Sequence, residues 1–133
     1  MLGVKGQSRL TVKDDMLAVN VGSGDVRVFA TPAMIAFMEK TAALGFLPYL
    51  EDGYTSVGTR VNVAHLTATP VGMKVHFQSE VLEVSDNGKM IALRVQTFDD
   101  AGLIGEGTHK RAIVKRIHFE EKALKKSFPQ ARK

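Results

Sequence analysis

The chain has 133 residues, of which 44% are apolar and 24% are charged, as in an ordinary globular domain. It contains no cysteine, which excludes disulfides, thiolate metal sites and a cysteine nucleophile. No stretch approaches the roughly 20 apolar residues of a membrane-spanning helix, and the N-terminus lacks a basic region followed by an apolar run. We therefore expect a single domain over residues 1–133, with no membrane partner and a cytoplasmic location.

The net charge of +4 raises the question of a nucleic-acid partner. Much of the excess lies in a cationic tail. Its basic residues include Lys122, Lys125, Lys126, Arg132 and Lys133. Only two Tyr and no Trp are present, so a basic surface interleaved with stacking aromatic rings is not apparent. A solvated tail is the favoured interpretation, and we expect no nucleic-acid partner.

The first part of the chain is predicted to form short strands at residues 8–12 and 16–21, followed by a helix. The helix is predicted to begin at Thr31, a plausible N-cap, because Pro32 suits the first helical turn. It is predicted to end near residues 45–47, just before a proline.

The rest of the chain has the pattern of antiparallel strands. Four strands and a short helix are predicted at residues 55–66, 73–84, 89–98, 103–118 and 120–126. Turn residues at 86–88 and 99–102 predict two hairpins. The apolar alternation breaks at Leu82 and Val84, which indicates a bulge or a strong twist. This order predicts an α+β domain whose antiparallel sheet curls around one buried helix. Short edge strands and the small size of the domain favour pairing of two sheets in a dimer.

Glu39 is a carboxylate on a helix with almost no other charge. Its neighbours three and four positions away are all apolar: Ile35, Ala36, Ala42 and Ala43. A buried carboxylate is costly unless it is paired, so a chemical role is one reason to keep it. The alternative is a carboxylate that reaches the surface or pairs with Lys40 or an arginine.

His65 is the second candidate for chemistry. Strand alternation places it on one face with Val57 and Val63, and places Gly58 on the other. The first face should meet the helix, so Glu39 and His65 are expected to approach each other. The alternative for His65 is a histidine satisfied in the core, and the alternative for Thr31 is a plain N-cap.

The other histidines give weaker signals. His109 stands beside Lys110 and Arg111, a group that suits phosphates, although a solvated cationic patch explains it equally well. The four histidines lack metal-like spacing, so we predict no metal site.

Several spaced motifs, in the same order along residues 29–114, resemble the hotdog-fold thioesterases of the fluoroacetyl-CoA thioesterase type. They are Ala30-Thr31, Glu39, Ser56-Val57-Gly58-Thr59, His65 with Ala68-Thr69-Pro70, and Gly105 to Ala112. The resemblance implies a hotdog fold, a homodimer with active sites near the subunit interface, and hydrolysis of an acyl-CoA thioester. It implies no cofactor, because CoA is part of the substrate.

The same resemblance assigns roles to single residues. Its catalytic threonine, glutamate and histidine map onto Thr31, Glu39 and His65. Gly58 maps onto a glycine whose backbone lies close to the acyl group or thioester, and Arg111 onto an arginine that supports the site or the CoA moiety. The substrate-binding residues expected beside them are Phe29 and Thr59.

The chain departs from this family before the helix. The connection at residues 21–29 is short and glycine-rich, and Phe29 is its only aromatic residue. Pro32 also stands where a glycine is found in the family. We therefore do not carry over an aromatic lid or selectivity for a fluorinated acyl group, and expect a small acyl chain of open identity.

Two other function classes remain open at this stage. A non-catalytic acyl-CoA or small-molecule binding module uses the same fold, and a nucleic-acid-binding domain is suggested by the charge alone. For the enzyme, the sequence does not decide whether Glu39 or water attacks the thioester.

Overall fold

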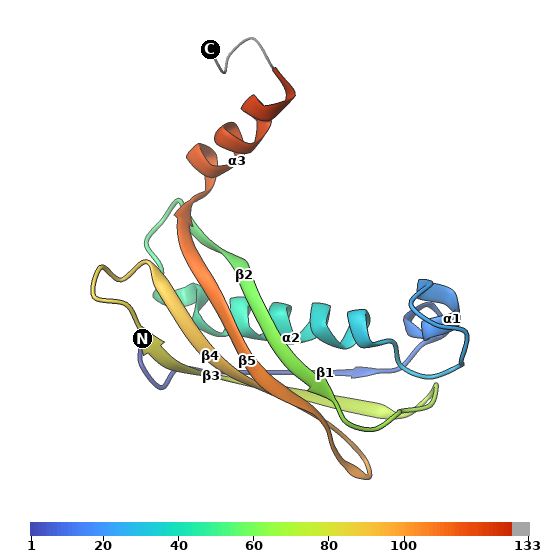
Figure 1. Cartoon of the computed structure of the whole chain (residues 1–133). Helices are drawn as coiled ribbons and strands as arrows, with labels where there is room; N and C mark the ends of the chain where they lie inside the picture. The colour runs from blue at the N-terminus through green and yellow to red at the C-terminus, as the bar shows by residue number, and fades with distance from the viewer. Residues whose placement is uncertain (129–133) are drawn as a thin grey trace.

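A long helix lies against the concave face of an antiparallel sheet (Figure 1). In the computed structural model, which describes residues 1–128, this helix is α2 (Thr31–Phe46). The described residues form a five-stranded sheet in the spatial order β1-β3-β4-β5-β2, with every neighbouring pair antiparallel. The strands are β1 (Lys5–Thr11), β2 (Tyr54–His65), β3 (Lys74–Val84), β4 (Met90–Asp99) and β5 (Gly102–Lys115). The predicted α+β architecture is confirmed.

The core lies between α2 and the sheet. Alternate residues of β3 and β4 are almost fully buried: Val75, Phe77, Val81, Ile91, Leu93 and Val95. The helix contributes a buried stripe at intervals of four residues: Met34, Met38, Ala42 and Phe46. Helix and sheet approach closely where Gly45 meets Gly6, since a Cβ on Gly45 would lie 2.9 Å from the Gly6 Cα. This close contact fixes α2 across β1.

The segment before α2 is helical, so the strand predicted at residues 16–21 is wrong. The chain forms η1 (Asp14–Met16) and α1 (Ala18–Val21) instead. Two local features favour these turns over a strand. The Asn20 side chain donates to the Asp14 carbonyl oxygen, and Gly22 ends α1 with a φ of 93°.

A bulge in β2 corrects the predicted faces of that strand. The pairing register of β2 with β5 shifts between Gly58 and Arg60. Gly58 and His65 therefore both face α2, although their even and odd numbers predict opposite faces. The bulge predicted in β3 is confirmed, between Val81 and Glu83.

The remaining elements differ from prediction mainly in their bounds. A 3₁₀ turn, η2 (Leu47–Tyr49), follows α2. Strand β5 ends at Lys115, and α3 (Arg116–Leu124) and η3 (Lys125–Ser127) follow it. Helix α3 projects away from the sheet (Figure 1). Along residues 1–128, no helix combines the length and apolar character needed to cross a membrane.

Candidate active site

Thr31 and His65 form a hydrogen-bonded pair where α2 begins and β2 ends. The distance from Thr31 Oγ1 to His65 Nδ1 is 2.7 Å. Ala30, not Thr31, is the N-cap residue, and no side chain caps the helix. The prediction of Thr31 as a plain N-cap is therefore wrong, and its hydroxyl is free to serve the imidazole. Since Thr31 is exposed, a ligand can reach this pair.

The imidazole of His65 favours its neutral form. Burial lowers the pKa of His65 below the ordinary value of 6.5. Its Nε2 atom is buried and has no hydrogen-bond partner among the described residues. A neutral imidazole keeps a lone pair for a proton, so near pH 7 His65 is chemically suited to act as a general base.

Glu39 forms an ion pair with Arg111 from β5. The distance from Arg111 Nη1 to Glu39 Oε2 is 3.2 Å. The Glu39 side chain is 39% exposed, so the expectation of a buried carboxylate is wrong. The buried stripe of α2 faces the core, and Glu39 lies to the side of this stripe, next to β2 and β5. The alternative that Glu39 pairs with an arginine is the one that the structure shows.

Arg111 is held in place by several hydrogen bonds. Its Nε donates to Ser56 Oγ at 2.8 Å, and its Nη2 donates to the Ser56 carbonyl oxygen at 3.0 Å. Its Nη1 lies 3.1 Å from His109 Nε2. Burial lowers the pKa of Arg111, and the Glu39 charge opposes this change. The guanidinium therefore presents a fixed donor to Glu39.

His109 is buried and connects this network to the backbone, so the alternative of a solvated cationic patch is wrong for this residue. Its Nδ1 lies 2.7 Å from the Arg60 carbonyl oxygen, which can only accept, so Nδ1 carries the proton. Nε2 is then the acceptor for Arg111. Burial lowers the pKa of His109, which favours this neutral form. The sequence held a usable signal, because His109 and Arg111 are two residues apart on one strand and must share a face.

Gly58 is required for space beside Glu39. A Cβ at this position would overlap Glu39 Oε2 and would lie 3.3 Å from His109 Cε1 and 3.4 Å from Arg111 Nη1. Gly58 is not among the glycines with a positive φ, so its lack of a side chain, and not an unusual conformation, is what the site uses. The β2 backbone therefore lies directly against the carboxylate.

Within one chain, the two pairs form separate clusters. Thr31 and Glu39 are eight residues apart on α2, or about 12 Å along the helix axis. His65 and Gly58 are seven residues apart on β2, or about 23 Å along the strand. No hydrogen bond or ion pair joins Glu39 to His65 in residues 1–128. The expectation that Glu39 and His65 meet is therefore not met within a single chain.

A hollow of about 370 Å³ opens beside the Thr31–His65 pair. Its apolar lining includes Ala18, Val26, Val28, Phe29 and Leu66. The predicted residue Phe29 thus lies next to the pair. Thr59, in contrast, does not line this hollow; it lies at the β2 bulge, where its hydroxyl donates to the Lys110 carbonyl oxygen at 3.2 Å.

Comparison with known proteins identifies the family. The model of the fluoroacetyl-CoA-specific thioesterase family, FlK, matches residues 12–117. The chain belongs to this family. It is 38% identical to the fluoroacetyl-CoA thioesterase of Streptantibioticus cattleyicolor over 100 residues, which cover 75% of this chain and 70% of that relative. The predicted family and the predicted class of enzyme, a thioester hydrolase, are confirmed by these matches.

Solved structures of thioesterases have the same fold. A structure of the fluoroacetyl-CoA thioesterase FlK superposes with a TM-score of 0.87 and 30% identity, covering 95% of this chain and 96% of that chain. A thioesterase superfamily member from Thermus thermophilus gives a TM-score of 0.84 and 25% identity, covering 98% and 96%. The predicted hotdog fold is therefore confirmed.

Proposed function

We propose that this protein hydrolyses a small acyl-CoA thioester, and that Thr31, Glu39 and His65 act on the thioester group. The observation that carries the proposal is the 2.7 Å contact of Thr31 Oγ1 with His65 Nδ1 beside an apolar hollow. The hollow suits an acyl chain, and the neutral imidazole suits proton transfer at the thioester. We also propose that the reaction needs no cofactor and takes place in the cytoplasm.

The residues supply the parts that thioester hydrolysis requires. The reaction breaks the bond between the carbonyl carbon and sulfur, adds the elements of water, and releases a carboxylic acid and the free thiol of CoA. Either Glu39 attacks the carbonyl carbon and water resolves the anhydride, or water activated by a base attacks directly. We favour Glu39 as the attacking group, because Arg111 and Gly58 fix its carboxylate in one orientation.

His65 and the start of α2 serve the remaining steps. In the route through Glu39 the thiolate leaves first, and a neutral His65 then takes a proton from the water that attacks the anhydride and passes it to the thiolate. In the direct route His65 takes the proton from the water that attacks the thioester and gives it to the departing thiolate. The first backbone N–H groups of α2 have no partners within the helix, so they are available to the oxyanion that forms in the transition state.

We further propose that the active site forms between two copies of the chain. Strand β2 is an edge of the described sheet, and its middle residues are exposed. If two β2 edges pair antiparallel with Asn62 opposite its own copy, the bulge after Gly58 shifts the register so that Gly58 of one chain faces the partner subunit's His65. The pairing would bring together Glu39 and His65, which are apart within one chain. Leu44 and Leu47, in and just after α2, are exposed apolar residues that a partner chain would cover if it lies on the α2 side of the sheet.

Mixing two inactive variants tests this arrangement. Glu39→Gln and His65→Ala are each expected to be inactive as homodimers. After unfolding and refolding together in equal amounts, half of the dimers contain one chain of each kind, and one of their two sites is intact. The mixture should recover about a quarter of the parent activity. No recovery, with mixed dimers shown by native mass spectrometry, would contradict a shared site.

The activity is tested by measuring CoA release from a panel of acetyl, propionyl, isobutyryl, hexanoyl and benzoyl thioesters. We expect turnover of the short or branched members, because the lining of the hollow has only Phe29 as an aromatic side chain. Glu39→Gln that folds normally and retains parent turnover would refute the role of Glu39. Acyl-CoA that binds without thiol release would favour the non-catalytic binding module.

A further inference from the structure

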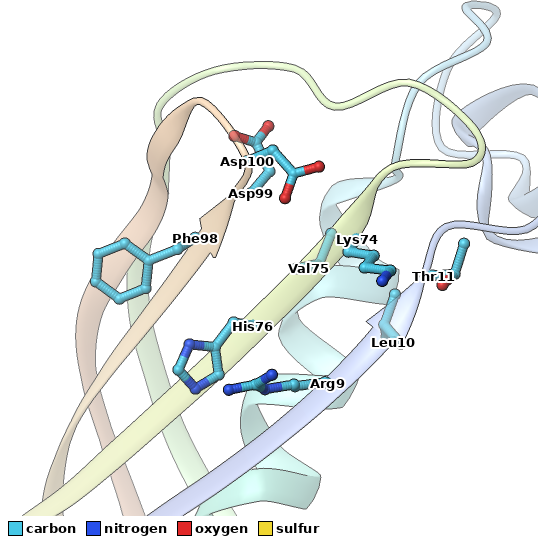
Figure 2. A pocket seen from close by; sticks show the side chains of 9 residues that line it. All are labelled: Arg9, Leu10, Thr11, Lys74, Val75, His76, Phe98, Asp99 and Asp100. Atoms are coloured by element: carbon cyan, nitrogen blue, oxygen red, sulfur yellow. The ribbon is translucent and has the colours of Figure 1, made fainter.

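A second hollow lies on the outer face of the sheet, the face that points away from α2. It has a volume of about 530 Å³ and is lined by residues of β1, β3, β4 and the turn after β4. Figure 2 shows Arg9, His76 and Phe98 on the near side of the sheet, with the helix behind it. The volume is within the range of small-molecule sites, which run from about 300 to 1,000 Å³.

The hollow holds two cations without an ion-pair partner among the described residues, Arg9 and Lys74, and two carboxylates at its rim, Asp99 and Asp100. Arg9 lies opposite His76 in the β1–β3 register, and Lys74 is two residues from His76 on the same face. In residues 1–128, neither Arg9 nor Lys74 has an ion-pair partner. Like charges on one sheet face destabilise the sheet, so an uncompensated group of this kind is suited to an anionic ligand.

The contrast with Arg94 on the same face makes this feature specific. Arg94 lies opposite Glu80 in the β3–β4 register and forms an ion pair with it. Near Arg9 the equivalent position is occupied by His76, which contacts Gln7 through Nε2 at 3.3 Å and leaves the guanidinium unpaired. The sheet thus compensates one arginine and not the other.

The two carboxylates at the rim of the hollow form no ion pair with Arg9 or Lys74 in residues 1–128. Asp99 accepts from Thr69 Oγ1 at 2.7 Å and from the Ala101 backbone N–H at 2.8 Å, which commits it to the turn after β4. Asp100 is exposed at the same end (Figure 2). An acidic group at this place is suited to accept hydrogen bonds from the hydroxyl groups of a sugar.

Phe98 adds an aromatic surface beside the cations. It lies opposite His76 in the β3–β4 register, and the two ring centroids are 6.4 Å apart with their planes inclined by 38°. The side chains of Arg9, His76 and Phe98 therefore form one row across three strands (Figure 2). Flat rings of nucleic-acid bases stack on such side chains, and a guanidinium binds phosphate oxygens through two parallel hydrogen bonds.

We propose that this hollow binds a phosphorylated purine nucleoside, with its base against Phe98 and His76 and its phosphate on Arg9 and Lys74. Two sources share this chemistry, a free adenine nucleotide and the 3′-phospho-ADP part of a CoA molecule. The site lies on the opposite face of the sheet from Thr31, His65 and Glu39. The proposal goes beyond hydrolysis of the thioester and does not depend on it.

Isothermal titration calorimetry on the full chain tests the proposal, with AMP, 3′,5′-ADP and ribose 5-phosphate as probes. We expect one AMP or 3′,5′-ADP per chain, and the tighter of the two identifies the source. Arg9→Gln should weaken both nucleotides at least tenfold. Phe98→Leu should weaken them about tenfold but leave ribose 5-phosphate unchanged, because that probe has no base to stack.

Arg94→Gln is the matched control, since it removes one positive charge from the same face outside the hollow. It should leave nucleotide affinity within about twofold of the parent, and Arg9→Gln should leave CoA release from the thioester unchanged. Equal weakening by Arg9→Gln and Arg94→Gln would overturn the site in favour of general charge attraction. No heat of binding at millimolar nucleotide, or equal affinity for AMP and ribose 5-phosphate, would also overturn it.

Discussion

Replacing Gly58 with alanine tests whether the position of the Glu39 carboxylate controls catalysis. The new Cβ would overlap Glu39 Oε2, and the next nearest atoms, on His109 and Arg111, are buried and fixed by hydrogen bonds. The flexible end of Glu39 is therefore the part that moves. We expect the carboxylate to shift by about 1 Å or more and to lose its contact with Arg111 Nη1.

The effect of Gly58→Ala on stability should be small. Since Glu39 is 39% exposed, its lost ion pair with Arg111 costs at most about 1 kcal/mol. Alanine offsets part of this cost by about 0.4–1 kcal/mol, because it restricts the unfolded chain and Gly58 has no positive φ. The free energy of unfolding should stay within about 1 kcal/mol of the parent, or about 4 °C in Tm.

The effect on turnover should be large. A displacement of about 1 Å in a reacting group can lower the rate about 100-fold, so we expect kcat/KM for CoA release to fall by roughly this factor. Turnover and thermal unfolding are measured on the same preparations. The double variant Gly58→Ala/Glu39→Gln should have a kcat/KM close to that of Glu39→Gln alone, because both substitutions disable the same carboxylate. Parent-like turnover, or a loss matched by unfolding, would refute the reasoning.

Other consequences concern the same groups. Thr31→Ala should lower kcat at least tenfold, because it removes the hydroxyl that binds His65, but should lower the free energy of unfolding by only about 1 kcal/mol or less, because that hydroxyl caps no helix. Thr31→Ser keeps the hydroxyl and should retain turnover. Equal losses of kcat in both variants would contradict this role. The pKa of His65 is lowered by burial, so kcat/KM should stay level from pH 8 to 6.5 and fall only below 6.5, and an inflection above 6.5 would be inconsistent with the buried ring. The pKa values of His65 and His109 are both lowered in the folded state, so below pH 6.5 the unfolded chain binds more protons than the folded chain. Their contribution to the free energy of unfolding should therefore be constant above pH 6.5 and should decrease as the pH falls toward the pKa values of the folded state. Urea unfolding at several pH values should show this acid loss, up to about 1.4 kcal/mol per pH unit for each group, and His109→Gln should reduce the slope. Arg111→Lys should lower the free energy of unfolding by about 1–3 kcal/mol, because one ammonium cannot reach Ser56, His109 and Glu39 together; a parent-like Tm would refute that prediction.

The periodic parts of the chain could be predicted from sequence. The helix over Thr31–Phe46 and the apolar faces of β3 and β4 follow from spacings of four and two residues, and tertiary packing reinforces them. The error at residues 16–21 arose where the segment is short. There a single side-chain bond from Asn20 and a glycine at position 22 outweigh the weak alternation.

The site was harder to predict, because it depends on one inserted residue. The bulge after Gly58 changes the face of every later residue in β2, and no pattern in residues 55–66 marks it. The burial of His109 was also missed, because a run of three basic residues is typical of an exposed surface. Only the alternation of β5 shows that His109 and Arg111 share a face of the sheet. Glu39 was singled out as a buried carboxylate, but the helix carries it beside the core instead of within it.

The order of the motifs along the sequence does not show whether two motifs meet within one chain or between two chains. Thr31 and His65 meet within one chain, whereas Glu39 meets Arg111 about 12 Å farther along α2. A catalytic set with this spacing can act on one thioester only if something else brings the two clusters together. The unpaired β2 edge supplies such a means, because antiparallel pairing of two β2 strands would place Gly58 of each chain opposite His65 of the other. In this proposal the dimer is therefore a condition for catalysis, and dilution below the dimerisation constant should abolish turnover while each chain keeps its Thr31–His65 contact.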